Sequence, residues 1–230
     1  MNDFEDSSNY GNLSGDYHDY VFKDGRLLGQ FDQMYQNSKE VPWHQDMTAK
    51  KVIVDLDIAI IKHFMPLFNM KSLCDIGCGL GYVTARLYDH FSPLVNDLKI
   101  TGVDVSKEAV KQARKLQPHI DFLHLDLSCN KPDHLKFDFI YMKDVLWYIT
   151  DNIDEFFLNA KGMLNPGGGI YVMQSVPDTD QFVGSHLFPS TFEISKFLTR
   201  HFLPVYISST YEEKIIGAGM DKYLRFLGRQ

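Results

Sequence analysis

The fold is decided by residues 73–81, which read Leu73-Cys74-Asp75-Ile76-Gly77-Cys78-Gly79-Leu80-Gly81. The stretch begins as an apolar run, continues with glycine at every second position, and leads into an apolar-periodic segment from Tyr82 onward. Glycine lets a backbone turn sharply and approach a ligand without a Cβ clash. The first turn of the following helix would add free N–H groups and positive potential. The stretch therefore predicts a strand, a ligand-binding loop and a helix.

The spacing of the glycines separates two classes of cofactor site. A dinucleotide fingerprint has the spacing G-x-G-x-x-G, which requires glycine at position 82, where this chain has Tyr82. The spacing here is G-x-G-x-G, with Asp75 two residues before Gly77. An NAD(P)-binding oxidoreductase therefore becomes the first alternative rather than the leading interpretation.

Strands and helices alternate outward from the loop. The strands are expected at residues 72–76, 99–103, 120–123, 137–142 and 169–174, and the helices between them at 82–91, 107–116 and 152–164. This order is typical of βαβ units and a parallel sheet, in which the ligand crevice lies at the carboxyl ends of the strands. A helix at 191–201 and two strands at 205–210 and 221–227 follow, and the two strands are expected to form an antiparallel pair at one sheet edge.

Helix ends and helix faces carry further signals. Residues 47–69 read as one helix, with Val52, Leu56, Ala59, Ile60 and His63 on its apolar face. Ser106 is expected to cap the helix at 107–116. Asp151 with Asp154 resembles a capping box for the helix at 152–164, and Asn165-Pro166-Gly167 is expected to stop that helix.

Two acids follow the next strands in the crevice. Asp104 ends the second strand, where a carboxylate can accept hydrogen bonds from the two hydroxyls of a ribose. Asp126 ends the third strand, where it can accept from an adenine amino group. The competing interpretations are a neighbour of a helix cap for Asp104 and an ordinary polar strand end for Asp126.

These residues resemble the class I S-adenosylmethionine (SAM)-dependent methyltransferase family from about Met47 onward. The matching positions are Asp75, Gly77, Gly79 and Gly81 in the glycine motif, Asp104 and Asp126 as the ribose and adenine acids, and the segments 142–146 and 164–168 around the fourth and fifth strands. The resemblance implies SAM as cofactor and a doubly wound, mostly parallel seven-stranded α/β sheet with an antiparallel last strand and three layers. Among the cofactor-binding residues we also include Cys78, Val105, Leu127 and Lys143, with Cys78 as a packing residue and not a redox centre.

An N-terminal arm, residues 1–46, precedes the predicted methyltransferase domain, residues 47–230. Its first 20 residues carry five acids and no Lys or Arg, which indicates a flexible segment able to act as a lid. Tyr35 and Trp43 are expected to wall the cofactor site, because an aromatic face attracts a sulfonium cation. The alternative is that they only attach the arm to the domain.

Four side chains are candidates for the catalytic acid–base group. Asp144 and Tyr148 follow the fourth strand, His44 lies in the arm, and His186 lies in the loop after the fifth strand. For the two histidines the competing interpretation is an exposed loop position, and for Asp144 it is a helix cap. No metal site is expected, since the Asp151-Asn152 pair fits a helix start better than a magnesium ligand set.

Composition narrows the substrate class. The net charge is −7, with no basic cluster, which disfavours nucleic acid as a partner. The three cysteines and the absence of a leader pattern indicate the cytoplasm, and charges interrupt the longest apolar stretch, so no membrane span is expected. We expect methylation of an O or N atom of a small metabolite, such as a sugar, nucleotide-sugar or natural-product intermediate. A catalytically silent SAM-binding protein is the second alternative, and a homodimer is left open.

Overall fold

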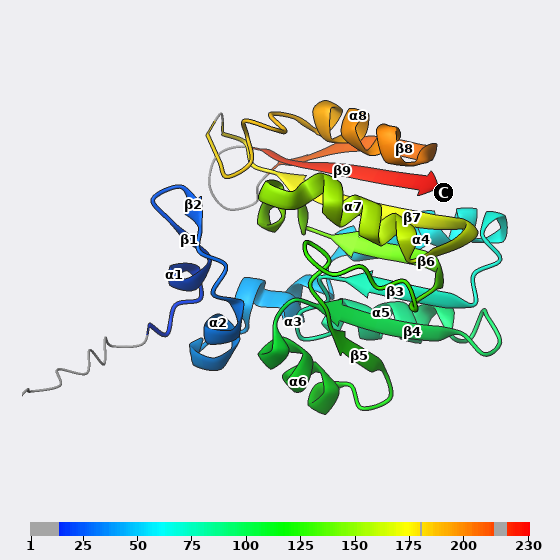
Figure 1. Cartoon of the computed structure of the whole chain (residues 1–230), viewed down its shortest axis with the longest axis horizontal. Helices are drawn as coiled ribbons and strands as arrows, with labels where there is room; N and C mark the ends of the chain where they lie inside the picture. Colours follow the sequence, from blue (N-terminus) through cyan, green and yellow to red (C-terminus); the bar gives the residue numbers. More distant parts are fainter. Residues whose placement is uncertain (1–13, 180, 214–219) are drawn as a thin grey trace, which may run out of the picture.

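The main sheet has seven strands in the computed structural model of the chain, which describes residues 14–179, 181–213 and 220–230. They are β3 (Ser72–Ile76), β4 (Lys99–Asp104), β5 (Asp121–His124), β6 (Phe137–Lys143), β7 (Leu164–Val176), β8 (Leu203–Glu213) and β9 (Met220–Arg229). Their order is β5-β4-β3-β6-β7-β9-β8 (Figure 1). The first five strands of this order are parallel, and β9 runs antiparallel to both β7 and β8. The predicted fold class is confirmed, including the antiparallel last strand, β9, which pairs with the edge strand β8.

Helices cover both faces of the sheet. They are α4 (Val52–Phe64), α5 (Tyr82–Phe91), α6 (Lys107–Leu116), α7 (Ile153–Gly162) and α8 (Thr191–His201). Helices α4 and α5 share a hydrophobic cluster with one face, and α7 and α8 share another with the opposite face (Figure 1). Alternate side chains of strand β6 point to opposite faces of the sheet. Phe139 and Tyr141 belong to the first cluster, whereas Ile140 and Met142 belong to the second. The central run Phe139–Met142 of β6 is buried on both faces and is apolar, as is typical of parallel sheets.

The N-terminal arm folds at the carboxyl ends of the parallel strands (Figure 1). It contains α1 (His18–Val21), the short hairpin β1 (Phe22–Lys23) and β2 (Arg26–Leu27), α2 (Phe31–Asn37), and α3 (Gln45–Thr48) after a 3-10 turn. Residues 1–13 of the segment predicted to be flexible lie outside the described residues. From Ser14 the arm is tied down, since Tyr17 and Tyr20 are buried and the Tyr20 hydroxyl donates to the Ser14 carbonyl at 2.7 Å.

The predicted helix at residues 47–69 is divided, and its predicted apolar face is wrong. It consists of the end of α3, helix α4 and a 3-10 turn at Met65–Leu67. Val52 is 79% and Leu56 41% exposed. The side that faces the sheet carries Val54, Asp57, Ile58 and Ile61. The predicted set did not include Asp57, a charged residue that is buried on the side facing the sheet.

Two predicted helix ends have different outcomes. Ser106 caps α6 as expected, and its Oγ accepts from the Ala109 N–H at 3.0 Å. The capping box of Asp151 with Asp154 is wrong, because Asn152 is the N-cap of α7 and no side chain caps it. Asp151 instead lies in a 3-10 turn at Thr150–Asn152. The segment 165–168, predicted as a turn, interrupts the pairing of β7 with β6 as an irregularity.

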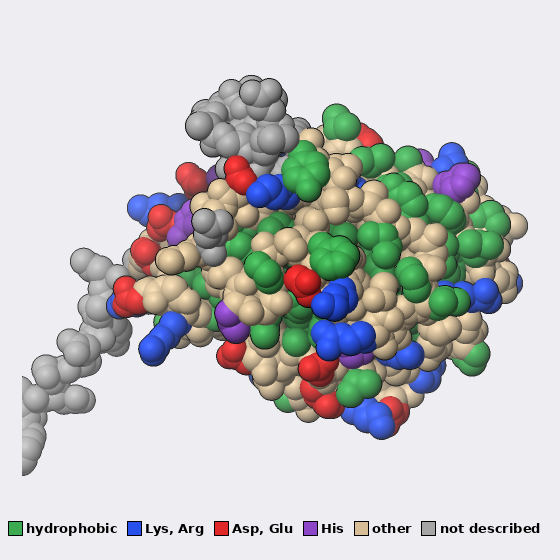
Figure 2. Space-filling model, turned by 90° about the horizontal axis from the view of Figure 1, so that it is seen from above, with side chains coloured by type: hydrophobic (Ala, Val, Ile, Leu, Met, Phe, Trp, Pro, Cys, Tyr) green, Lys and Arg blue, Asp and Glu red, His purple; other side chains and the backbone are tan. Residues whose placement is uncertain are grey.

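The edge strand β8 exposes apolar side chains along its length. Leu203, Ile207 and Tyr211 are among the exposed large hydrophobic residues. Figure 2, which views the molecule from above the sheet edge of Figure 1, shows apolar side chains gathered on this face with charged groups around them. A homodimer stays a prediction.

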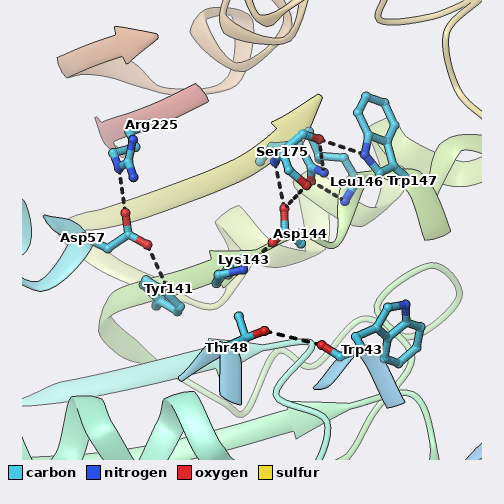
Figure 3. Close-up of polar contacts among 11 residues, drawn as sticks. Trp43, Thr48, Asp57, Tyr141, Lys143, Asp144, Leu146, Trp147, Ser175 and Arg225 are labelled. Carbon is cyan, nitrogen blue, oxygen red and sulfur yellow. Dashed lines mark hydrogen bonds and ion pairs between the residues drawn. The ribbon is translucent and has the colours of Figure 1, made fainter. Parts of the chain in front are cut away.

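A buried ion pair joins α4 to the antiparallel end of the sheet (Figure 3). Arg225 Nε on β9 donates to Asp57 Oδ1 at 2.7 Å, and the two side chains are 1% and 0% exposed. The Tyr171 and Tyr141 hydroxyls donate to the same carboxylate at 2.9 and 3.2 Å. Burial of a charge is tolerated only when it is paired and hydrogen-bonded, so these four side chains form one interdependent unit.

Replacing Arg225 with methionine should lower the free energy of unfolding by about 3–5 kcal/mol, because it leaves the Asp57 carboxylate buried without a counterion. Urea unfolding followed by circular dichroism measures the change. Arg229→Met on the same strand, at an exposed position, is the matched control and should change stability little. The double variant Asp57→Leu/Arg225→Met should recover part of the loss. A loss below about 1 kcal/mol for the single variant would contradict a structural role for the pair.

Candidate functional site

The glycine loop is fixed by hydrogen bonds to the tip of the neighbouring strand β4. The N–H groups of Gly77 and Cys78 donate to the Val103 carbonyl at 2.8 and 3.1 Å. Gly77 and Gly81 have φ values of 77° and 78°, a region that residues with a Cβ rarely adopt. The Cys78 side chain is buried beside Gly102, and burial raises the pKa of its thiol. Cys78 is therefore a protonated packing residue at the edge of the loop.

Asp104 lies against the glycine loop. Its Oδ2 accepts from the Gly79 N–H and its Oδ1 from the Ser106 N–H, both at 2.8 Å. Burial raises the pKa of Asp104, although both hydrogen bonds favour the ionised form. Each carboxylate oxygen has a second acceptor position, so the side chain can accept from a ligand while it holds the loop.

Asp126 follows β5 on the same side of the sheet. Its Oδ1 accepts from the Ser128 N–H at 2.8 Å, and its Oδ2 lies 3.3 Å from the Cys129 sulfur. Its neighbour Leu127 is buried, while Val105 beyond the tip of β4 is exposed. All three residues line the same cavity as Asp104.

Asp75 is a buried acid at the inner side of the loop. Its Oδ2 accepts from the Thr84 hydroxyl of α5 at 2.6 Å. Burial raises the pKa of Asp75 to about 7, while the Thr84 hydrogen bond and the charge of Lys143 limit the rise. Its charge state therefore changes near neutral pH, and a nearby cation would favour the ionised form.

Lys143 and Asp144 form an ion pair at the tip of β6 (Figure 3). Asp144 Oδ1 also accepts from the Ser175 N–H at 2.7 Å and from the Ser175 hydroxyl at 2.6 Å. Burial acts to raise the pKa of Asp144, but the Lys143 charge and the hydrogen bonds from Lys143 and Ser175 outweigh it and lower the pKa. Asp144 has a left-handed φ of 55°, which aspartate tolerates better than most residues. It is thus ionised and engaged on both oxygens.

The arm is bound directly to the glycine loop. Gln45 Oε1 accepts from the Leu80 N–H at 2.9 Å, and Gln45 Nε2 donates to the Tyr35 hydroxyl at 2.9 Å. A Cβ at Gly79 would lie within 2.7 Å of both side chains. Gly79 therefore makes room for the arm, and Tyr35 reaches the site through Gln45.

Aromatic rings from the arm and from the segment after β6 form one wall. Trp43 lies 5.6 Å from Tyr148 and 6.2 Å from Tyr35 between ring centroids, and Phe31 lies 5.9 Å from Tyr148. Trp43 and His44 both have left-handed φ values, 53° and 48°. Such backbone costs about 1–2 kcal/mol per residue, so packing of the arm must maintain the turn that presents Trp43.

The candidate acid–base residues lie in different places. His44 and His186 are exposed, and neither is among the residues that line the cavity. Asp144 and Tyr148 line it. Burial raises the pKa of Tyr148, and the Asp144 charge adds to this effect, so its phenol remains a proton donor. In this conformation none of the four combines a place in the cavity with a free basic atom.

The predicted cofactor residues converge on one cavity of about 580 Å³ at the carboxyl ends of the strands. Lining residues predicted from the sequence are Tyr35, Trp43, Asp75, Gly77, Cys78, Asp104, Val105, Asp126, Leu127 and Lys143. Gly79 instead meets the arm, and Gly81 packs against Phe122. Among the described residues no group of three or more His, Cys, Asp or Glu side chains is arranged to hold a metal ion.

The donor set fits SAM. Carboxylates suit the ribose hydroxyls, the adenine amino group and the ammonium group, and Lys143 suits the carboxylate of the methionine part. No helix in the described part of the chain is both long and apolar enough to cross a bilayer.

Several site residues were missed by the sequence analysis. Gln45 and Ser175 line the cavity, and Asp32 of the arm accepts from the Ser106 hydroxyl at 2.7 Å and from the Glu108 N–H at 3.0 Å. Gln45 and Asp32 lie in an arm without regular periodicity, so no local pattern marks them. Ser175 alone could have been predicted, because it directly follows the fifth predicted strand, and ligand sites lie at the carboxyl ends of parallel strands.

Comparison with known proteins identifies the domain. Residues 74–170 match a family model described as a methyltransferase domain. Trans-aconitate 2-methyltransferase of Escherichia coli O139:H28 (strain E24377A / ETEC) is 32% identical over 114 residues, which cover 50% of this chain and 42% of the relative. The chain thus spans less than half the length of the curated relatives it matches.

Solved structures share the fold at low sequence identity. The CurJ carbon methyltransferase has a TM-score of 0.64 and 15% identity, and the match covers 88% of this chain and 62% of that one. The N-methyltransferase NodS from Bradyrhizobium japonicum WM9, in complex with S-adenosyl-L-homocysteine (SAH), has a TM-score of 0.59 and 19% identity over 86% of this chain and 98% of that one. Residues 74–170 therefore match a methyltransferase domain, and the fold of the chain is the one that these solved SAM-dependent methyltransferases share, in agreement with the predicted resemblance.

Proposed function

We propose that the protein transfers the methyl group of SAM to an oxygen or nitrogen atom of a small molecule. The observation that carries the proposal is the convergence of Gly77, Asp104, Asp126 and Lys143 on one cavity, with the arm as its outer wall. The matched methyltransferase domain and the SAH complex of NodS support SAM as the cofactor of this site. We expect Asp104 to accept from the ribose hydroxyls and Asp126 from the adenine amino group.

The remaining polar groups suit the methionine part of the cofactor. Asp75 lies beside the glycine loop and can pair with an ammonium group, and Lys143 can donate to a carboxylate while it keeps its bond to Asp144. Both side chains line the same cavity as the aromatic wall. In our proposal they orient the cofactor with its sulfonium toward Trp43 and Tyr148.

Positioning is the main contribution of the protein to such a transfer. Bound SAM supplies an electrophilic methyl group, so the side chains have to align the acceptor and keep water out, an effect worth roughly 7–11 kcal/mol in favourable cases. The faces of Trp43 and Tyr148 can stabilise the sulfonium charge by about 0.5–2 kcal/mol. The Tyr148 phenol can also donate a hydrogen bond to the acceptor.

The state of the candidate bases supports a particular kind of acceptor atom. Asp144 is held by Lys143 and Ser175, Tyr148 is protonated, and His44 and His186 are exposed away from the cavity. An aliphatic hydroxyl benefits from a general base, whereas an unprotonated amine or a phenol needs less assistance. We infer that the acceptor atom belongs to an amine or a phenol.

Calorimetry should show that SAM and SAH bind and that NAD and NADP do not. Asp104→Ala should weaken SAM binding roughly 10–100-fold, equivalent to about 1.5–3 kcal/mol, because buried ribose hydroxyls lose a charged acceptor. Asp121→Ala, at an exposed position of β5, is the control and should bind normally. Thermal unfolding verifies that both variants are folded. Tight NAD binding without SAM binding would contradict the proposal.

Binding of SAM should strengthen as the pH rises through the pKa of Asp75. Ionised Asp75 attracts the ammonium group, and with a pKa of about 7 it is mostly protonated at lower pH. Between about pH 5.5 and 7 the Kd should therefore fall by up to about tenfold per pH unit, a range in which an α-ammonium stays charged. The Asp75→Asn variant should show a nearly flat profile in the same titration. Equal slopes in both proteins would exclude Asp75 as the ammonium ligand.

The arm should become better protected when cofactor binds. Amides in residues 17–46 should exchange more slowly with SAH present, because the arm is linked to the glycine loop through Gln45. Hydrogen-exchange mass spectrometry measures this, with α8 as an internal control that stays unchanged. Deleting residues 1–40 should keep the domain folded and abolish most turnover. Unchanged exchange together with normal turnover of the truncated enzyme would show that the arm is only an attached tail.

A further inference from the structure

The charges around the cofactor cavity restrict the charge that an acceptor molecule can carry. This inference rests on the proposed function. The described residues that line the cavity include five aspartates, at positions 75, 104, 126, 144 and 151, and one lysine, Lys143. Lys143 is already paired with Asp144. Like charges placed together cost several kcal/mol. A polycarboxylate or a diphosphate would therefore meet several carboxylates, and the one cationic side chain among the described lining residues is already paired. An uncharged molecule would avoid this repulsion.

A second, apolar groove lies beside this cavity, between the β1–β2 hairpin and the loop after β7. Its volume is about 570 Å³. The described residues that line it are Phe22, Gly25, Trp147, Pro177, Gln181, Phe182, Val183 and Ser185, and none of them is charged. An aromatic or aliphatic group could bury its surface there without leaving a charged partner unsatisfied.

The indole of Trp147 forms the boundary between the groove and the cofactor cavity, and it lines both. Its Nε1 donates to the Ser175 carbonyl at 3.0 Å (Figure 3). The Phe182 ring meets it edge-on at 4.9 Å between centroids, and a Cβ at Gly184 would lie only 2.8 Å from it. Trp147 is thus held from three sides, in an orientation in which it borders both spaces.

The arm also borders both spaces. Leu27 and Phe31 line the cofactor cavity, while Phe22 and Gly25 of the same hairpin region line the groove. Phe22 stacks on Tyr148 at 5.7 Å between centroids. A ligand that extends from the groove past Trp147 and Tyr148 into the cofactor cavity would therefore contact residues of the arm on both sides.

We propose that the apolar groove binds the body of an uncharged, apolar acceptor, such as an alkyl-substituted phenol or aromatic amine. The nucleophilic atom of the acceptor then lies in the cofactor cavity, which Trp147 and Tyr148 also line. The acceptor then differs from trans-aconitate, the tricarboxylate in the name of the curated relative, and from a nucleotide-sugar. Uncharged natural-product intermediates remain within the expected class.

Tryptophan fluorescence offers a direct test, because the chain has two tryptophans, Trp43 and Trp147, and both line the cavity. The probes are 4-alkylphenols from methyl to hexyl, titrated into protein saturated with SAH, with trans-aconitate as the anionic comparison. We expect saturable quenching by the phenols, with a Kd that falls up to roughly fourfold for each added methylene. Trans-aconitate should produce no saturable change.

Variants at the groove separate this site from general hydrophobic binding. Val183→Asp places a charge in the groove and should remove the dependence on alkyl length, whereas Leu187→Asp should bind the phenols normally. Leu187 is 40% exposed in the same loop and is not among the lining residues. Gln181→Leu, at an exposed lining position, should tighten hexylphenol binding about twofold or more, which keeps the test valid if Val183→Asp does not fold.

The outcomes distinguish a failure of the proposed function from a failure of the groove assignment. If calorimetry detects no SAH binding, the proposed function itself fails. If SAH binds but alkyl length has no effect, or trans-aconitate binds more tightly than the phenols, only the assignment of the groove is overturned. Equal losses in Val183→Asp and Leu187→Asp would likewise overturn it.

Discussion

The end of strand β4 determines the shape of the whole site. Its Val103 carbonyl accepts two N–H groups of the glycine loop, and the next side chain, Asp104, accepts a third. The loop thus takes its conformation from the neighbouring strand, and the parallel register of β3 with β4 sets the distance between them. A backbone with few side chains has little else to hold it. The placement of the glycine loop against Asp104 follows from this attachment.

The arm is bound to the same region of the backbone, at the start of α6 and at the glycine loop. Asp32 accepts from Ser106 and Glu108 at the start of α6, directly after the tip of β4, and Gln45 accepts from Leu80 in the loop. Free N–H groups at a helix start favour an anionic partner, here supplied from the arm. The aromatic wall is therefore positioned by polar contacts to the same backbone that is expected to face the cofactor.

Local patterns in the sequence predicted the parts of the molecule that local rules govern. The glycine spacing, the acids at the strand tips and the Ser106 cap are each recognisable within a few residues. The exposed face of α4 was mispredicted because the partner of Asp57 is Arg225, 168 positions away. Gln45 and Asp32 were missed for the same reason, since their partners are N–H groups of distant segments. A charge or amide that is satisfied by tertiary contacts looks like a surface residue in a one-dimensional pattern.

The buried ion pair also bears on the order in which the chain can fold. Strand β9, which carries Arg225, is inserted between β7 and β8, although β8 precedes it in the chain. Helix α4 is synthesised long before its counterion, and contacts of such large sequence separation form slowly. During translation, Asp57 has to remain solvated until residues 220–229 have left the ribosome. The seam between α4 and the antiparallel end of the sheet is therefore expected to form late, once β9 has been made.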